Sequence, residues 1–186
     1  PANAALWAAL AVTHSNDGSS PSFQEHCLQR ALTLQPKCGD AWVCLADLYF
    51  AAGDQTLASE CLQLARIHSP WCARAWESEG RMRQQLGLGR ALKFFELAAR
   101  MGNSASANLG FAVESAFGGR SLSQASVAAG QALRVDPSNA LAWAVMGSLQ
   151  EAQGRPQRAC DCYQAALRRL GDTLGCGGDT PPPGER

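Results

Sequence analysis

The sequence predicts an all-α protein made of stacked helix-turn-helix repeats, and three observations lead to this fold class. The 186 residues are 46% hydrophobic and 17% charged, which is typical of folded proteins. Tryptophan recurs with a period near 34 residues, since Trp7, Trp42 and Trp76 lie 35 and 34 residues apart and Trp143 follows 67 residues later. Alanine and glycine recur at fixed places between the tryptophans. A period of this length indicates helical repeats that stack, because one repeat cannot bury its apolar face alone.

The repeat at residues 39–72 shows the pattern most completely. Trp42 stands at position 4 of this repeat and Pro70 at position 32, and the characteristic positions between them hold Leu45, Ala46, Tyr49, Ala58, Leu62 and Ala65. This order of large and small residues resembles the tetratricopeptide-repeat (TPR) family. The resemblance implies a right-handed superhelical TPR solenoid of about five repeats, each made of two antiparallel helices.

The expected repeats follow in order at residues 4–38, 39–72, 73–103, 104–139 and 140–170. The first has one extra residue in its turn, and the third has one residue fewer, with Asn103 in place of the proline. The fourth lacks the tryptophan but keeps Leu109 and Gly110, and the fifth keeps Trp143. Residues 171–186 are rich in glycine and proline, so we expect a flexible tail there.

The expected helix pairs have a simple physical basis. Small residues at positions 8, 20 and 27 let the two helices approach closely. Proline at position 32 ends the second helix, because proline cannot continue an α-helix. Gly53, Gly87 and Gly154 supply turn conformations that other residues resist.

Composition and charge exclude several classes of protein. The 16 basic and 16 acidic side chains give a formal net charge of zero, which leaves no electrostatic footprint for direct nucleic-acid binding. No apolar run approaches the roughly 20 residues of a membrane helix, and the first residues do not read as a signal peptide. We therefore expect a cytoplasmic protein, with the nucleus as the other compartment, and expect its eight cysteines to be reduced.

The sequence contains no recognisable catalytic motif, so we expect a non-enzyme without a cofactor or metal. Cys160 and Cys162 are two residues apart, and such residues point about 200° apart on a helix, which does not suit one metal ion. His26 adjoins Cys27, but neighbouring helical residues do not face each other. An enzymatic alternative requires a Cys–His site organised in three dimensions.

In TPR solenoids the first helix of each repeat lines a concave groove, and its positions 2, 5, 9 and 12 face that groove. The resemblance therefore gives partner-binding candidates, which are Val43, Asp47, Phe50, Arg74, Glu77, Arg81, Phe111 and Glu114. They do not reproduce the Lys, Asn and Arg clamp with which chaperone-adaptor TPR domains hold a terminal carboxylate. Their mixed charge and apolar patches favour a folded or extended protein partner.

Arg74, Glu77 and Arg81 share one helix face. Two interpretations stay open for them. Glu77 and Arg81 are four residues apart in the favourable order, so they can form a solvated ion pair worth about a few tenths of a kcal/mol. Alternatively, they can anchor a polar partner, since arginine is enriched at interface hot spots.

A closer resemblance depends on the irregular repeats. The segment AWESEGRMRQQLGLGRALKFFELAARMG is followed by the tryptophan-free SASANLGFAVESA and later by NALAWAVMGSLQEAQGRPQRACDCYQAAL. This order resembles the TPR scaffold subunit of the superkiller complex. The resemblance implies a scaffold in cytoplasmic mRNA decay that carries an RNA helicase and WD-repeat subunits and serves the RNA exosome. The alternative is a TPR adaptor or targeting segment of a larger enzyme or another complex.

Overall fold

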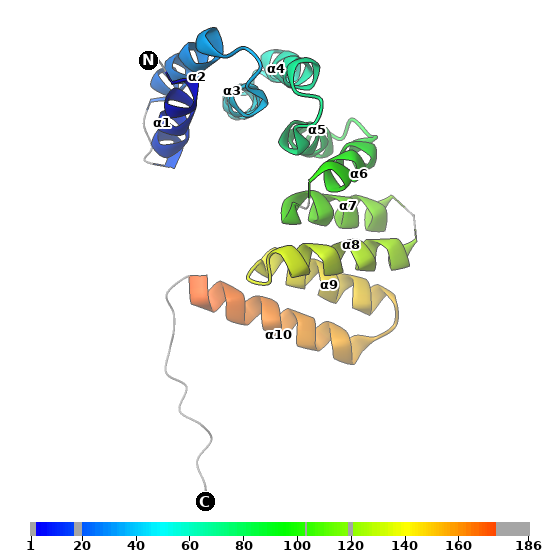
Figure 1. Cartoon of the computed structure of the whole chain (residues 1–186). Coiled ribbons are helices and arrows are strands. Elements are labelled where there is room, and N and C mark those ends of the chain that lie inside the picture. The colour runs from blue at the N-terminus through cyan, green and yellow to red at the C-terminus, as the bar shows by residue number, and fades with distance from the viewer. Residues whose placement is uncertain (1–2, 17–19, 103, 119–120, 174–186) are drawn as a thin grey trace, which may run out of the picture. The chain divides into compact units, whose positions relative to one another are not determined.

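The computed structural model describes residues 3–16, 20–102, 104–118 and 121–173. Within these residues it contains ten α-helices and no strand (Figure 1). The helices are α1 (Ala4–Asn16), α2 (Pro21–Leu34), α3 (Gly39–Ala51), α4 (Gln55–His68), α5 (Ala73–Gln85), α6 (Ala91–Met101), α7 (Ala105–Phe117), α8 (Leu122–Val135), α9 (Ala140–Ala152) and α10 (Pro156–Thr173). The predicted all-α fold class is confirmed, and one helix pair lies within each expected repeat up to residue 170.

The turns inside the repeats follow local sequence signals. Asp54 caps α4 by accepting a hydrogen bond from the backbone N–H of Leu57 at 3.3 Å. Gly53, just before this cap, has φ of +88°, a left-handed conformation that favours glycine. Pro156 occupies the first position of α10, where its missing N–H breaks no helical hydrogen bond.

The third repeat departs from the expectation of a shorter turn. Its turn spans residues 86–90, and α6 is correspondingly short at 11 residues. Gly87, Gly89 and Arg90 all have positive φ, at 64°, 67° and 60°. Because these left-handed conformations are not helical, α6 begins only at Ala91. The third repeat is therefore shorter in its second helix and not in its turn.

The chain divides into two compact units, which we call unit 1 (Pro1–Gly110) and unit 2 (Phe111–Arg186). The boundary lies within α7, whereas the sequence pattern treats residues 1–170 as one solenoid. Each unit is therefore described separately below.

The core is built from small residues facing large ones. In unit 1, a Cβ atom on Gly80 would lie 3.0 Å from the ring of Phe95, so only glycine allows this close helix contact without displacement. In unit 2, a Cβ atom on Gly147 would lie 2.7 Å from the ring of Tyr163. Both pairs join position 8 of one helix to position 24 of its partner, as the repeat pattern predicts.

Trp42, Trp76 and Trp143 bind the turns that precede them. The indole N–H groups donate hydrogen bonds to the carbonyl oxygen of the proline six residues earlier, and the pairs are Trp42–Pro36 at 2.9 Å, Trp76–Pro70 at 3.1 Å and Trp143–Pro137 at 3.0 Å. Each bond fixes the first helix of a repeat to the end of the previous repeat.

The C-terminal boundary corrects one expectation. Helix α10 continues through Gly171 to Thr173, although we expected the tail to begin at Gly171. One glycine costs a helix only about 1 kcal/mol, which does not stop a helix that is already formed. Residues 174–186 of the expected tail lie outside the described residues.

Candidate partner-binding site

The structure distributes the candidate residues over both units. In unit 1, α3 carries Val43, Asp47 and Phe50, and the neighbouring α5 carries Arg74, Glu77 and Arg81. Phe111 and Glu114 lie on the part of α7 that belongs to unit 2. The structure therefore brings the first six together on two adjacent helices and leaves the last two in a separate unit.

Val43 is the one candidate with no exposed surface. Its side chain is 0% exposed and belongs to a core cluster that includes Cys27 and Leu28 of α2. The position rule identified the side of α3 that Val43 occupies, but the first repeat covers this side. Val43 therefore contributes to the core of unit 1, which corrects the expectation of an apolar patch there.

Two hollows adjoin Asp47. One has a volume of about 390 Å³, and its lining includes Leu28, Cys44, Asp47, Leu48 and Arg74. The other has a volume of about 320 Å³, and its lining includes Asp47, Phe50, Leu62, Ser78 and Arg81. We call this part of unit 1, comprising Asp47, Phe50, Arg74, Arg81 and the two hollows, the α3–α5 surface. Its walls are largely apolar, and its charges are concentrated around Asp47.

Ion pairs cross the α3–α5 surface between consecutive repeats. The guanidinium of Arg81 lies 3.4 Å from the carboxylate of Asp47, and that of Arg74 lies 3.5 Å from the carboxylate of Asp40. In both pairs the two residues are 34 positions apart, so they occupy the same position in successive repeats. Roughly half of each side chain remains exposed, which leaves these groups accessible to a partner.

Glu77 forms different contacts from those expected. Its carboxylate accepts hydrogen bonds from the hydroxyls of Ser104 at 3.0 Å and Ser106 at 2.5 Å. The intrahelical ion pair with Arg81, one of the two interpretations left open, does not form: Glu77 contacts the following repeat, while Arg81 contacts the preceding one. The spacing along one helix could not reveal this, because the competing groups come from neighbouring repeats.

Burial changes the acid–base properties of this surface. It raises the pKa of the Asp47 carboxyl, although the nearby Arg81 guanidinium opposes this change. It also raises the pKa of the Cys44 thiol, although Arg74 Nη2 lies 3.9 Å from its sulfur and favours the thiolate. Cys44 is therefore held as a thiol, which does not favour nucleophilic chemistry.

In unit 2, Phe111 and Glu114 are both half-buried. Phe111 packs against a core cluster that includes Ala112, Ala125 and Leu149. Part of its ring therefore stabilises unit 2, and only the remainder is available to a partner.

Sequence reasoning missed Glu79, a buried carboxylate on the other side of α5. Glu79 is 2% exposed, and its Oε1 accepts a hydrogen bond from Arg83 Nε at 2.7 Å. Its Oε2 lies 3.9 Å from Arg66 and has no hydrogen-bond partner. A signal was present in the sequence, because Glu79 stands at position 7, where the repeat at 39–72 has the apolar Leu45.

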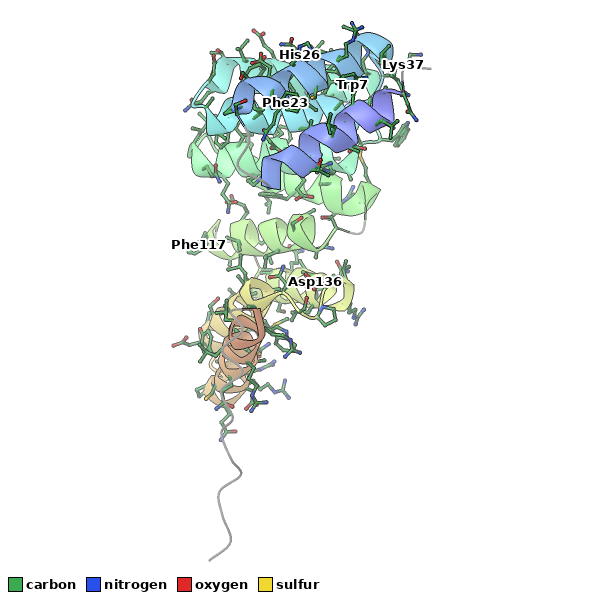
Figure 2. The ribbon with its side chains drawn as sticks, turned by 90° about the vertical axis from the view of Figure 1, so that its left-hand side faces the viewer. Trp7, Phe23, His26, Lys37, Phe117 and Asp136 are labelled. Atoms are coloured by element: carbon green, nitrogen blue, oxygen red, sulfur yellow. The ribbon has the colours of Figure 1, made fainter. Side chains whose placement is uncertain are left out.

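The cysteine and histidine positions give no cluster that could hold a metal ion among the described residues. Figure 2 labels His26 on α2, where its side chain is exposed, whereas the adjacent Cys27 is fully buried. Cys160 is exposed and Cys162 is half-buried, and both are free thiols. Across the described part of the chain, no three His, Cys, Asp or Glu side chains gather in a way that could hold a metal ion. Cys176 lies outside that part.

A helix that spans a bilayer must be both long and apolar. Among the described helices, none combines the length and the apolar character that a membrane crossing requires.

The chain resembles known proteins in sequence over part of their length and in structure over most of it. No protein-family model matches the chain. A curated relative, Protein NPGR1 of Arabidopsis thaliana, is 31% identical over 146 residues, which are 77% of this chain. The chain spans only 21% of the length of that relative.

Solved TPR structures superpose on most of the chain. PilF of Pseudomonas aeruginosa has a TM-score of 0.78 and 16% identity, covering 92% of this chain and 84% of its own. TTC0263, a TPR protein of Thermus thermophilus, has a TM-score of 0.70 and 18% identity, covering 92% and 94%. YrrB, a TPR protein with an unusual peptide-binding site, has a TM-score of 0.64 and 17% identity, covering 90% and 87%. With its ten described helices and these structural relatives, the chain has the fold of a TPR solenoid.

Proposed function

We propose that this chain is a protein-interaction scaffold and that the α3–α5 surface of unit 1 binds a protein partner. The observation that carries this proposal is the pair of hollows on either side of Asp47, with volumes of about 390 and 320 Å³. Each hollow can accept an apolar side chain, and the ion pairs beside it can orient the backbone of a partner. The chain then acts by binding and without covalent chemistry.

The candidate residues take different parts in this proposal. Phe50 supplies an apolar contact, while Asp47, Arg74 and Arg81 supply polar ones. Arginine is enriched among the residues that dominate interface energies, so Arg81 is the first residue to change. Phe111 and Glu114 would act as a separate contact from unit 2.

The finer proposal is a subunit of a superkiller-like complex that supports exosome-linked cytoplasmic mRNA decay. The resemblance, which runs from about Asn3 to Leu170, supports it. Under this proposal the protein partners are an RNA helicase and WD-repeat subunits, and the helicase carries the chemistry. The alternative is a TPR adaptor or targeting segment of a larger enzyme or another complex.

Affinity purification of the tagged chain from cytosol, followed by mass spectrometry, tests these proposals. Recovery of an RNA helicase together with WD-repeat proteins supports the mRNA-decay scaffold. Recovery of another defined complex supports the adaptor alternative. So does recovery of a larger enzyme whose polypeptide includes this chain. Recovery of no specific protein would contradict the scaffold proposal.

Matched variants test the role of the α3–α5 surface. Arg81→Glu reverses a charge on this surface and should remove the bound proteins. Arg100→Glu makes the same change on α6, where Arg100 pairs with Glu96 and is 73% exposed, and should leave binding intact. An identical set of captured proteins for wild type and Arg81→Glu would show that the partner binds elsewhere.

A further inference from the structure

A third hollow lies between α4 and α5, and it has a volume of about 340 Å³. Arg66 and Gln63 of α4 line one wall, and Glu79 and Arg83 of α5 line the other together with Leu86 of the following turn. We call it the α4–α5 furrow. It is distinct from the α3–α5 surface, because Arg81 and Arg83 are two residues apart on α5 and project about 200° from each other.

Two arginines are fixed in position at this furrow. Arg83 donates Nε–H to the buried Glu79 carboxylate at 2.7 Å, and its guanidinium lies 4.7 Å from the centre of the Phe94 ring. Arg66 lies 5.3 Å from the centre of the Trp76 ring and 5.8 Å from that of Phe94. Cation–π contacts of this kind restrict each guanidinium to the neighbourhood of its aromatic ring. The two groups are thus preorganised before any partner arrives.

Among the described residues of unit 1, most of the N–H donors of these arginines have no hydrogen-bond acceptor. A guanidinium has five N–H donors, and Arg83 gives only its Nε–H to Glu79. Arg66 lies 3.9 Å from Glu79, which is an ion pair but too long for a hydrogen bond. Their side chains are 22% and 30% exposed, and both line the furrow. The remaining donors are accordingly available to an acceptor that enters it.

The charge of the lining selects the acceptor. Two guanidinium groups and one carboxylate give the furrow a net charge of one positive unit. Asp54 lies close by, but its carboxylate accepts hydrogen bonds from the Thr56 hydroxyl at 2.7 Å and from the backbone N–H of Leu57. A single carboxylate balances this charge, whereas a phosphate dianion would exceed it.

The apolar residues of the lining favour an acidic side chain that has methylene groups to cover them. Met82, Leu86 and Leu88 border the charged groups, and Leu88 is 59% exposed. The two methylene groups of a glutamate can cover these side chains while its carboxylate reaches the arginines. We propose that the α4–α5 furrow is a second docking surface, which binds a glutamate side chain of a partner protein.

NMR titration of the whole chain tests this proposal with two peptides that differ only in charge, Ac-Gly-Glu-Gly-NH2 and Ac-Gly-Gln-Gly-NH2. Millimolar glutamate peptide should shift the side-chain Nε–Hε signals of Arg66 and Arg83 in a saturable way. The glutamine peptide should shift them little. An equal response to both peptides, or no response of either arginine, would overturn the proposal. So would tighter binding of the corresponding phosphoserine peptide.

Two exposed glutamines provide matched variants. Gln63 lines the furrow three residues before Arg66, so Gln63→Glu places a competing carboxylate beside it. This substitution should weaken binding of the glutamate peptide about fivefold, the size of one exposed charge interaction. Gln85→Glu makes the same change at the lining of the 320 Å³ hollow and should leave this binding unchanged. Equal effects of both variants would indicate a general charge effect and would count against the furrow.

Discussion

Asp47 and Arg81 occupy equivalent positions in consecutive repeats, and their charged groups lie 3.4 Å apart across the α3–α5 surface. Arg74 and Asp40 repeat this relationship at 3.5 Å. Equivalent positions of consecutive repeats lie next to each other in the stacked helices. An acidic residue in the second repeat and a basic residue at the same position of the third therefore form an ion pair. The pairs link the second and third repeats, while their half-exposed side chains remain accessible to a partner.

We expect the Asp47–Arg81 pair to contribute little to stability. Both side chains are about half exposed, and exposed ion pairs are worth about 0.2–1 kcal/mol. A double-mutant cycle of Asp47→Ala and Arg81→Ala, measured by urea unfolding, should give a coupling energy within that range. A coupling of about 3 kcal/mol or more would instead indicate a pair that behaves as buried.

Glu79→Gln should destabilise the protein by about 2 kcal/mol, because the buried group loses its charge while two arginines face it. Glu96→Gln is the matched control, since Glu96 also pairs with an arginine four residues later at 2.7 Å but is 38% exposed. The control should cost less than about 0.5 kcal/mol. Chemical denaturation measures the free energy of unfolding of each variant relative to wild type. Equal losses would show that the burial of Glu79 adds nothing to its pairing.

Gly147→Ala should destabilise the protein by about 1–3 kcal/mol, because the added Cβ atom would lie 2.7 Å from the Tyr163 ring. Gly130→Ala is the comparison, since its added Cβ atom meets nothing closer than Met146 Cε at 3.8 Å. There the higher helix propensity of alanine should add up to about 1 kcal/mol. The midpoint temperature of thermal unfolding should therefore fall for Gly147→Ala and rise for Gly130→Ala. A loss of stability at both positions would contradict the contact argument.

The free energy of unfolding should fall as the pH rises from 10 to about 12. The Tyr49 hydroxyl donates a hydrogen bond to Glu25 at 2.7 Å, and this bond together with burial raises its pKa from 10.0 to about 12. The unfolded chain therefore loses the Tyr49 proton before the folded chain does, so the stabilisation is complete below pH 10 and is lost above it. Urea unfolding across this interval, followed by phenolate absorbance, measures the effect. Tyr49→Phe should reduce the slope, and an unchanged pH profile in that variant would assign the effect to other groups whose pKa is raised in the fold, such as Tyr163 and Cys61.

The repeat fold was predictable because its signals are local and periodic. The Trp42–Pro36 bond and the Gly80–Phe95 contact both depend on residues at fixed repeat positions. Their spacing can be read along the chain, so the helix pairs follow from the sequence.

The candidate site was predictable only in part. The position rule placed Asp47, Phe50 and Arg81 at the α3–α5 surface, but it could not reveal that neighbouring helices bury Val43. The contacts of Glu77 with Ser104 and Ser106 also depend on the next repeat. Accessibility and long-range pairing are properties of the packed chain, so the spacing within one helix does not determine them.

The tryptophan–proline hydrogen bonds have a consequence for insertions and deletions. Where such a bond forms, the connection between repeats has four residues in every case, at 35–38, 69–72 and 136–139. The connection at 102–104, which has neither the proline nor the tryptophan, is one residue shorter. The turns inside repeats vary from three residues at 52–54 to five at 86–90. New sequence, such as an epitope tag or a reporter, should therefore be accepted inside a repeat and rejected between two repeats.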